Sequence, residues 1–333
     1  MSPTRRQILT ATALSLGSPL VARHALGDAP AFRLKATMAD VASHPIYGML
    51  NTWADDIRNR TNGAVEIKVY GAGQLGSQAN ALTAMQTGTI DFVCHTTGFI
   101  ETIYPSVAVL DLPYILQSSA EAEKVLDGPV GQTLFEQFPT KGIVGLCWGH
   151  WGWRPVTQTK KLVPHPDDIA GTKIRVQPGA IYAATYQTLK APPTAIDVSE
   201  VYLALSQGAV DAVEVPLISL IASKFYEVAK HVSNVNFVYN AGAIMASKRT
   251  MDKLPPAFQK AVQDASTAVS PGWRTMMAAK TEDAITFLKG QGCTFTDVDK
   301  AAYATALQPV WTQYKPIVGA DLVNAIQQQT GRA

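Results

Sequence analysis

The sequence predicts an α/β fold, and three observations point to it. The chain has 333 residues, 47% of them hydrophobic and 16% charged, which is ordinary for a globular protein and enough for two domains. Alternating runs such as 65–70 (VEIKVY) predict strands, and stretches such as 77–87 predict helices. Segment 171–216 is predicted as strand, helix, helix, strand, a unit whose strand ends face a crevice.

Within that segment, Arg175 is the central candidate for binding a ligand. In the predicted strand 173–176, Ile174 and Val176 share one face and Arg175 points to the other. Pro178-Gly179 ends the strand. Two helical stretches follow, the second starting at a Ser199 N-cap, and 209–215 is predicted as a short buried strand.

The rest of the chain alternates in the same way. Further strands are expected at 32–38, 88–94, 142–148, 232–238, 243–247 and 294–298. Further helices are expected at 47–61, 119–126, 128–138, 219–228, 257–289, 301–314 and 319–329. The long stretch 257–289 contains Ser270-Pro271-Gly272, where we expect a kink or break.

Residues 1–27 have the features of an export signal. Arg5-Arg6 precedes a mildly apolar run, and Ala25-Leu26-Gly27 supplies the small residues of a cleavage site. This order predicts export of the folded chain to the bacterial periplasm by the twin-arginine route. Removal of the segment leaves 25 basic and 26 acidic residues. A nearly neutral protein without a basic patch is not expected to bind nucleic acid.

Neither a metal site nor a bound cofactor is predicted. Cys94, Cys147 and Cys293 are far apart and lack Cys-x-x-Cys spacing, so buried free thiols are expected. The glycine-rich stretch 71–76 (GAGQLG) matches a dinucleotide fingerprint. However, it follows the second strand rather than the first, and no acidic residue closes a following strand at the expected distance.

Two further stretches carry candidate ligand residues. Thr96 lies at the carboxyl end of a predicted strand, the edge at which open α/β sheets bind ligands. Segment 148–155 contains three tryptophans, a histidine and an arginine, and aromatic rings with polar groups often line binding clefts. Its candidates are Trp148, Trp151 and Arg154, with packing between domains as the alternative for each ring.

Several motifs, in order, resemble one family. They are His44-Pro45, GQLG at 73–76, TGTIDF at 87–92, LPY at 112–114, GWRPVTQTKK at 152–161, KIRV at 173–176, SEVYLALSQGAVDAVEVP at 199–216, KFYEVAK at 224–230 and LPPAFQKAV from 254. From about residue 32 onward the chain resembles the DctP-type solute-binding proteins of TRAP transporters. This resemblance implies capture of a small organic anion and delivery to the transporter's membrane subunits.

The resemblance also implies a two-lobed periplasmic-binding-protein fold with hinge strands and a long helix spanning both lobes. Lobe one would comprise 28–151 and 241–280, and lobe two 152–240 and 281–333. The solute would be enclosed between the lobes when the hinge closes.

In this family the arginine matching Arg175 pairs with the solute carboxylate. A guanidinium presents two N–H groups that match both carboxylate oxygens. Arg154 matches a second basic position and His44 lies in the first matching motif. The alternative for Arg175 is a structural salt bridge to Asp211 or Glu214.

One residue departs from the family pattern. Many relatives have Glu-Asn-Pro where this chain has Glu214-Val215-Pro216, and valine cannot donate a hydrogen bond to a carboxylate. Arg175 then binds with fewer donors, or Asn240, Gln177 or Thr96 substitutes, or the solute differs. The nearby tryptophans favour a monocarboxylate with an apolar or aromatic body.

Two other functions stay open at this point. Twin-arginine export would also suit a periplasmic oxidoreductase, although the chain lacks Gly-x-Ser-x-Gly, His-Glu-x-x-His and a cysteine cluster. A ligand-sensing partner of a membrane receptor would share the same fold. A binding protein without catalytic residues is the preferred prediction.

Overall fold

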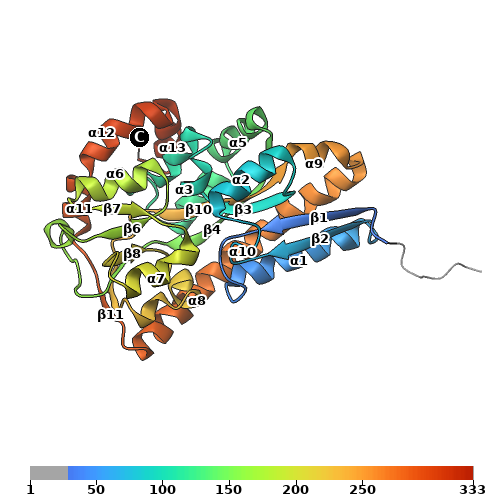
Figure 1. The fold of residues 1–333 in the computed structure, drawn as a ribbon. Coiled ribbons are helices and arrows are strands. Elements are labelled where there is room, and N and C mark those ends of the chain that lie inside the picture. The colour runs from blue at the N-terminus through green and yellow to red at the C-terminus, as the bar shows by residue number, and fades with distance from the viewer. Residues whose placement is uncertain (1–28, 333) are drawn as a thin grey trace, which may run out of the picture.

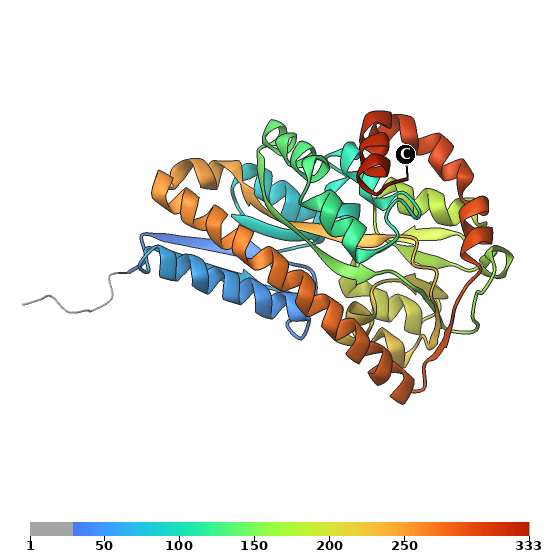
Figure 2. The same cartoon turned by 180° about the vertical axis from the view of Figure 1, so that it is seen from behind.

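The computed structural model describes residues 29–332, which form an elongated molecule built on two sheets (Figures 1 and 2). The predicted signal segment and its arginine pair lie outside the described residues. The chain passes from the first sheet to the second between Trp153 and Val156, and it returns between Ser233 and Tyr239.

The first sheet has five strands in the order β2-β1-β3-β10-β4. Strand β1 pairs in parallel with β2 and β3, and β10 runs antiparallel to β3 and β4. The carboxyl ends of β1 and β3 therefore meet the start of β10 at one edge. The strands are β1 (Phe32–Thr37), β2 (Val65–Tyr70), β3 (Phe92–Thr96), β4 (Ile143–Trp153) and β10 (Tyr239–Ser247).

Helices cover the first sheet, and α1 shows why they form where they do. His44 caps its start, Pro45 occupies the first turn, and its buried face includes Leu50 and Trp53. The helices and 3-10 turns of this part are α1 (Pro45–Arg60), α2 (Gln78–Thr87), α3 (Thr97–Ile100), η1 (Pro105–Asp111), α4 (Ser119–Leu126), α5 (Pro129–Glu136), η2 (Phe138–Lys141) and α9 (Lys248–Lys253).

The second sheet has six short strands in the order β11-β9-β5-β8-β6-β7. They are β5 (Val156–Gln158), β6 (Ile174–Val176), β7 (Pro193–Ala195), β8 (Ala212–Glu214), β9 (His231–Ser233) and β11 (Thr294–Thr296). Their helices and turns are η3 (Pro166–Ile169), α6 (Ala180–Thr188), η4 (Val198–Glu200), α7 (Val201–Ser206), α8 (Leu217–Ala222) and η5 (Phe225–Glu227). The predicted order of segment 171–216 is confirmed, with β7 as an additional strand.

Some predicted boundaries were wrong. Strand β10 begins at Tyr239 rather than residue 243, because Tyr239 and Ala241 already pair with β4. The predicted strand 232–238 is regular only through Ser233. The predicted helix 219–228 ends at Ala222, because Lys224 adopts a left-handed φ of 58°.

Helix α10 (Pro256–Gly290) runs uninterrupted along both sheets, so the predicted break at residues 270–272 is wrong (Figure 2). Tertiary contacts on both sides of Pro271 hold the helix there. Ser270 Oγ donates to the Trp148 carbonyl at 2.6 Å, and Arg274 donates two hydrogen bonds of 2.5 Å to Asp127. These contacts outweigh the loss of one backbone hydrogen bond at proline.

Three helices form the C-terminal part: α11 (Lys300–Ala306), α12 (Gln308–Val318) and α13 (Ala320–Gln329). Helix α12 continues through Pro316, where the sequence predicted a junction, and the chain turns instead at Gly319, whose φ is 100°. Helix α12 packs on η1 and α6, and α13 packs on α4 and α5. The C-terminal helices therefore contact helices and turns that belong to both sheets.

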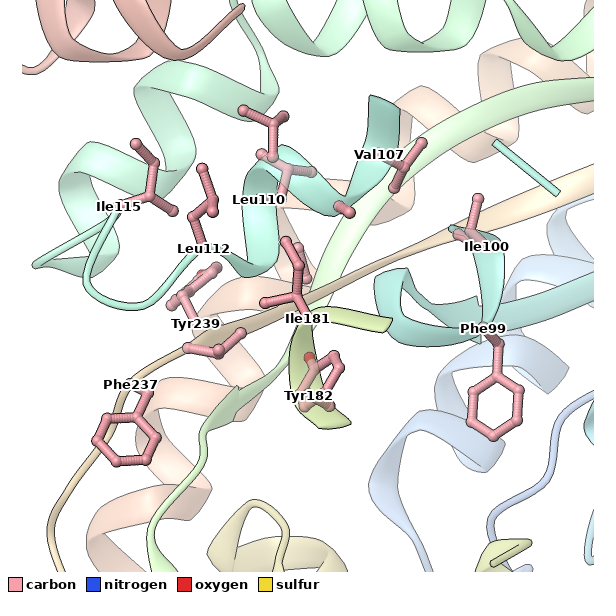
Figure 3. Close-up of a cluster of buried hydrophobic side chains, with 14 of the residues drawn as sticks. Phe99, Ile100, Val107, Leu110, Leu112, Ile115, Ile181, Tyr182, Phe237 and Tyr239 are labelled. Atoms are coloured by element: carbon pink, nitrogen blue, oxygen red, sulfur yellow. The ribbon is translucent and has the colours of Figure 1, made fainter. Parts of the chain in front are cut away.

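The buried core extends across the contact between the sheets. Figure 3 shows Ile181 and Tyr182 of α6 near Leu110, Leu112 and Tyr239, which belong to the first-sheet side. The three cysteines are buried and free, as predicted. Between residues 29 and 332 no helix is long and apolar enough to cross a membrane, and no three potential metal-ligating side chains gather at one place.

Candidate functional site

A small cavity of about 30 Å³ lies between the two sheets. The first sheet and its loops contribute part of its wall, and the second sheet contributes the rest. Seven of the nine predicted site residues line it: Thr96, Trp151, Arg154, Arg175, Gln177, Val215 and Asn240. Residues that the prediction missed complete the wall: Asp40, Gln78, Phe99, Val198, Pro216 and Ser219.

Arg175 is a buried cation without a carboxylate partner in the described chain. It lies on β6, between β8 and the edge strand β7 of the second sheet, and is only 2% exposed. Nε donates to the Ile196 carbonyl at 2.8 Å, and no acidic oxygen between residues 29 and 332 lies within 4.0 Å of the guanidinium. Burial, together with the charge of Arg154, lowers the pKa of Arg175 to about 10. It stays charged at neutral pH.

Arg154 is also buried, but its charge is balanced. Its Nε lies 2.9 Å from Glu214 Oε1, its Nη2 donates to the Glu214 carbonyl, and its Cζ lies over the Tyr182 ring, 5.2 Å from the ring centre. Asp211 pairs with Lys160 at 3.0 Å. Both acids considered as structural partners of Arg175 therefore pair with other residues. The guanidinium of Arg175 is free to meet an anion.

A chain of polar side chains connects the two sheets beside Arg175. Thr96 Oγ1 donates to Gln177 Oε1, and Gln177 Nε2 donates to Asn240 Oδ1 at 3.4 Å. This arrangement leaves the Asn240 Nδ2 amide with no partner among residues 29–332. A residue that lines the cavity thus has an unused N–H donor, although Val215 supplies none.

The two tryptophans predicted for the site have different positions. Trp151 lines the cavity, and its Nε1 donates to Asp40 Oδ2 at 2.9 Å. Trp148 lies in the core, where it stacks on Phe135 with ring centres 4.3 Å apart and donates to the Gly131 carbonyl. Alternation along β4 explains the difference, because residues three apart in a strand point to opposite faces.

His44 lies next to the cavity rather than on its wall. Its Nδ1 accepts from Ile46 N at 3.3 Å, which caps α1, and its Nε2 lies 3.3 Å from the hydroxyl of Ser219. Because Nδ1 accepts a hydrogen bond it carries no proton, which makes the ring neutral, and burial lowers the pKa of His44 in the same sense. Nε2–H then donates to Ser219, which lines the cavity. His44 therefore positions a wall residue from the opposite sheet.

Two further acids, Asp111 and Glu101, are buried but do not line the cavity. Asp111 Oδ1 accepts from Thr97 at 2.7 Å and from Tyr182 at 3.0 Å. Glu101 lies against Gly179 at the start of α6. Burial raises the pKa of Asp111 to about 7, and burial together with Asp111 raises that of Glu101 well above its usual value. The Tyr182–Asp111 bond joins α6 to η1.

A signal for Asp40 was present in the sequence. Asp40 follows β1, just as Thr96 ends β3, and both strands end at the same sheet edge. The strand-end rule that selected Thr96 would have selected Asp40 as well. Gln78 and Ser219 lie near the starts of helices and gave no comparable signal.

Comparison with known proteins agrees with this architecture. Residues 36–316 match the DctP family model, described as bacterial extracellular solute-binding protein, family 7. A solute-binding protein of Verminephrobacter eiseniae is 32% identical over 84% of this chain and 83% of its own length. The C4-dicarboxylate-binding periplasmic protein DctP of Rhodobacter capsulatus is 30% identical, over 81% of this chain and 82% of its own.

A crystal structure of a TRAP periplasmic solute-binding protein from Polaromonas sp. JS666, bound to D-erythronate, superposes with a TM-score of 0.86 at 28% identity. The match covers 89% of this chain and 98% of that one. The predicted two-lobed α/β fold and the predicted resemblance are both confirmed. The chain belongs to family 7 of the bacterial extracellular solute-binding proteins, the DctP family.

Proposed function

We propose that this protein captures an organic acid between its two lobes and that Arg175 binds the acid's carboxylate. The observation that carries the proposal is the free, charged and almost fully buried guanidinium on a cavity wall. A buried charge without a partner is costly, and a bound carboxylate removes that cost. Asn240 Nδ2 supplies a further donor, in place of the asparagine absent at position 215.

The relatives support a carboxylate ligand. The Polaromonas protein is bound to D-erythronate, and the Rhodobacter protein is named for C4-dicarboxylates. The two solutes differ in charge but share a carboxylate group. One arginine without a protein partner can bind that shared carboxylate. The other residues of the cavity wall would then select the remainder of the solute.

We further propose the lobe division given by the sequence, with 28–151 and 241–280 in one lobe and 152–240 and 281–333 in the other. The crossings at 153–156 and 233–239, which connect the sheets, would serve as the hinge. A 30 Å³ cavity is far smaller than the several hundred Å³ of ordinary ligand pockets, so solute entry requires the lobes to separate. Helices α12 and α13 belong to the second lobe in this division, and their contacts with η1, α4 and α5 of the first lobe would change as the lobes separate.

The biological role follows from the family. We propose that the protein is exported by the twin-arginine route, carries the acid in the periplasm and delivers it to the membrane subunits of a TRAP transporter, without catalysing a reaction. Replacing Arg5 and Arg6 together with lysine would then retain the precursor in the cytoplasm. Export of the lysine variant at the normal rate would exclude that route.

Titration calorimetry of the ligand-stripped protein tests the carboxylate clamp. Arg175→Gln removes the charge and keeps a polar side chain, and it should weaken binding of every organic acid at least a hundredfold. Arg60→Gln is the control, because Arg60 is an exposed residue paired with Asp56 on α1. Equal affinity of the Arg175→Gln variant and wild type would overturn the proposal.

A further inference from the structure

The cavity wall has a third charged residue besides Arg175 and Arg154, and the carboxylate clamp does not explain its role. Asp40 follows β1 of the first sheet, whereas Arg175 lies on β6 of the second, and both line the same cavity. The side chain of Asp40 is nearly buried, with the residue 9% exposed. A cation and an anion therefore lie on walls contributed by different lobes.

The contacts of Asp40 hold it in place and leave one oxygen free. Trp151 donates to Oδ2 at 2.9 Å, and the N–H of Ala72 donates to the Asp40 carbonyl at 2.9 Å. Gly71 packs so closely that an added Cβ would lie 3.0 Å from that carbonyl. In the described chain, Oδ1 has no hydrogen-bond donor and no basic side chain lies within 4.0 Å. The glycine-rich segment 71–76 thus fixes an acceptor at the cavity.

A second acceptor lies on the same side of the cavity. The side chain of Gln78 lines the cavity, and its buried Oε1 has no partner in the structure as described. The backbone N–H of Gln78 is already bound to Asp197 at 3.1 Å, which fixes the start of α2. Two oxygen acceptors without a donor, one of them a carboxylate oxygen, therefore belong to residues that line the cavity from the side of the first sheet.

The charges of the wall decide which solutes fit. Arg154 and Glu214 neutralise each other, which leaves Arg175 as the free cation and Asp40 as the free anion of the lining. A first carboxylate of a solute is attracted to Arg175. A second carboxylate near Asp40 would meet like charge and acceptors without protons, whereas a hydroxyl or ammonium group would donate to them.

We infer that Asp40, with Gln78, forms a subsite for hydrogen-bond donors, so that the protein selects acids with one carboxylate and a distal hydroxyl or ammonium group and rejects dicarboxylates. This inference rests on the proposed carboxylate clamp at Arg175. The apolar side chains of Phe99, Val198 and Val215 contact the part of the solute between the two polar ends. Discrimination comes mainly from repulsion of the wrong solute.

Calorimetry and thermal shift on the ligand-stripped chain from residue 28 test the subsite with matched pairs. The pairs are D-erythronate with succinate and D-gluconate with D-glucarate, and 4-aminobutanoate tests the ammonium alternative. We expect the monocarboxylate of a pair to bind at least tenfold more tightly than its dicarboxylate. Asp40→Asn should reduce that ratio at least tenfold, and Asp56→Asn, on the exposed face of α1, should leave it unchanged.

The outcomes separate the two proposals. If Arg175→Gln abolishes binding while wild type binds the dicarboxylates equally or more tightly, the donor subsite is wrong and the clamp stands. The donor subsite is also wrong if Asp40→Asn keeps the wild-type ratio of monocarboxylate to dicarboxylate affinity. If no acid of the panel binds wild type, or if Arg175→Gln binds as wild type does, both proposals fail.

Discussion

Glu214 Oε1 lies 2.9 Å from Arg154 Nε, and both side chains are almost completely buried. Glu214 lies on β8, directly beside β6, which carries Arg175. Glu214 nevertheless pairs with Arg154, which lies between β4 and β5 where the chain crosses from the first sheet to the second. One buried arginine is thereby a structural cation, and the other is left available to a ligand.

The ion pair predicts a distinct response to mutation. Arg154→Met would leave the Glu214 carboxylate buried without its partner, and it should lower the free energy of unfolding by about 3–5 kcal/mol. The double variant Arg154→Met, Glu214→Leu should recover most of that loss, because neither charge is then buried alone. Urea unfolding without ligand measures the free energy of unfolding of the single variant and of the double variant. A double variant as unstable as the single one would contradict this account.

Arg175 should behave in the opposite way. Among residues 29–332 the buried guanidinium has only the Ile196 carbonyl as a partner, so Arg175→Met should keep or raise the stability of the ligand-free protein, by about 1 kcal/mol, while it removes solute binding. Thermal unfolding with and without an organic acid separates the two effects. A strongly destabilised Arg175→Met variant would indicate a structural role instead.

Asn240 should contribute to binding through its free amide. Asn240→Ala removes the Nδ2 donor and should weaken carboxylate binding about tenfold, in line with about 1–2 kcal/mol for one charge-assisted hydrogen bond. Asn240→Asp would place a carboxylate beside the solute carboxylate and should weaken binding further. Asn234→Ala, which loses only a contact to Asp297, is the control. If calorimetry gave equal affinities for Asn240→Ala, Asn240→Asp and Asn234→Ala, Asn240 would have no role in binding the carboxylate.

The fold could be predicted well where local sequence decides the structure. Alternation identified β2, and Arg175 was found on a short strand followed by two helices, whereas the predicted Ser199 cap was wrong because Asp197 caps the turn that precedes α7. Strands β5 (Val156–Gln158) and β7 (Pro193–Ala195) were missed because neither is part of a run of alternating apolar residues, and they are held by pairing with neighbouring strands. The break expected at Pro271 failed because contacts distant in sequence hold α10 together.

The site was predicted less completely, for a related reason. The aromatic cluster near residue 150 led us to predict both Trp148 and Trp151 as site residues. The orientation of β4 in the folded protein decides that the Trp151 ring reaches the cavity and the Trp148 ring enters the core. The pairing of Glu214 with Arg154 instead of Arg175 depends on where β4 crosses to the second sheet. Such choices are made by tertiary structure, and no local pattern encodes them.

The buried pair Asp111 and Glu101 predicts that stability falls as pH rises. Burial raises the pKa of Asp111 from 3.8 to about 7, so between about pH 4 and pH 7 the folded state binds more protons than the unfolded state. The free energy of unfolding should therefore decrease across that range. The raised pKa of Glu101 has the same sign and extends the decrease to higher pH.

Asp111→Asn tests this dependence, because the amide keeps an oxygen that can accept from Thr97 and Tyr182 but does not ionise. Urea unfolding at pH 5 and pH 8 should show a smaller loss of stability in the variant than in wild type, by at least about 1 kcal/mol. Asp56→Asn, an exposed substitution that also removes one carboxylate, should follow wild type. Parallel pH profiles for Asp111→Asn and wild type would show that Asp111 does not take up the proton on folding.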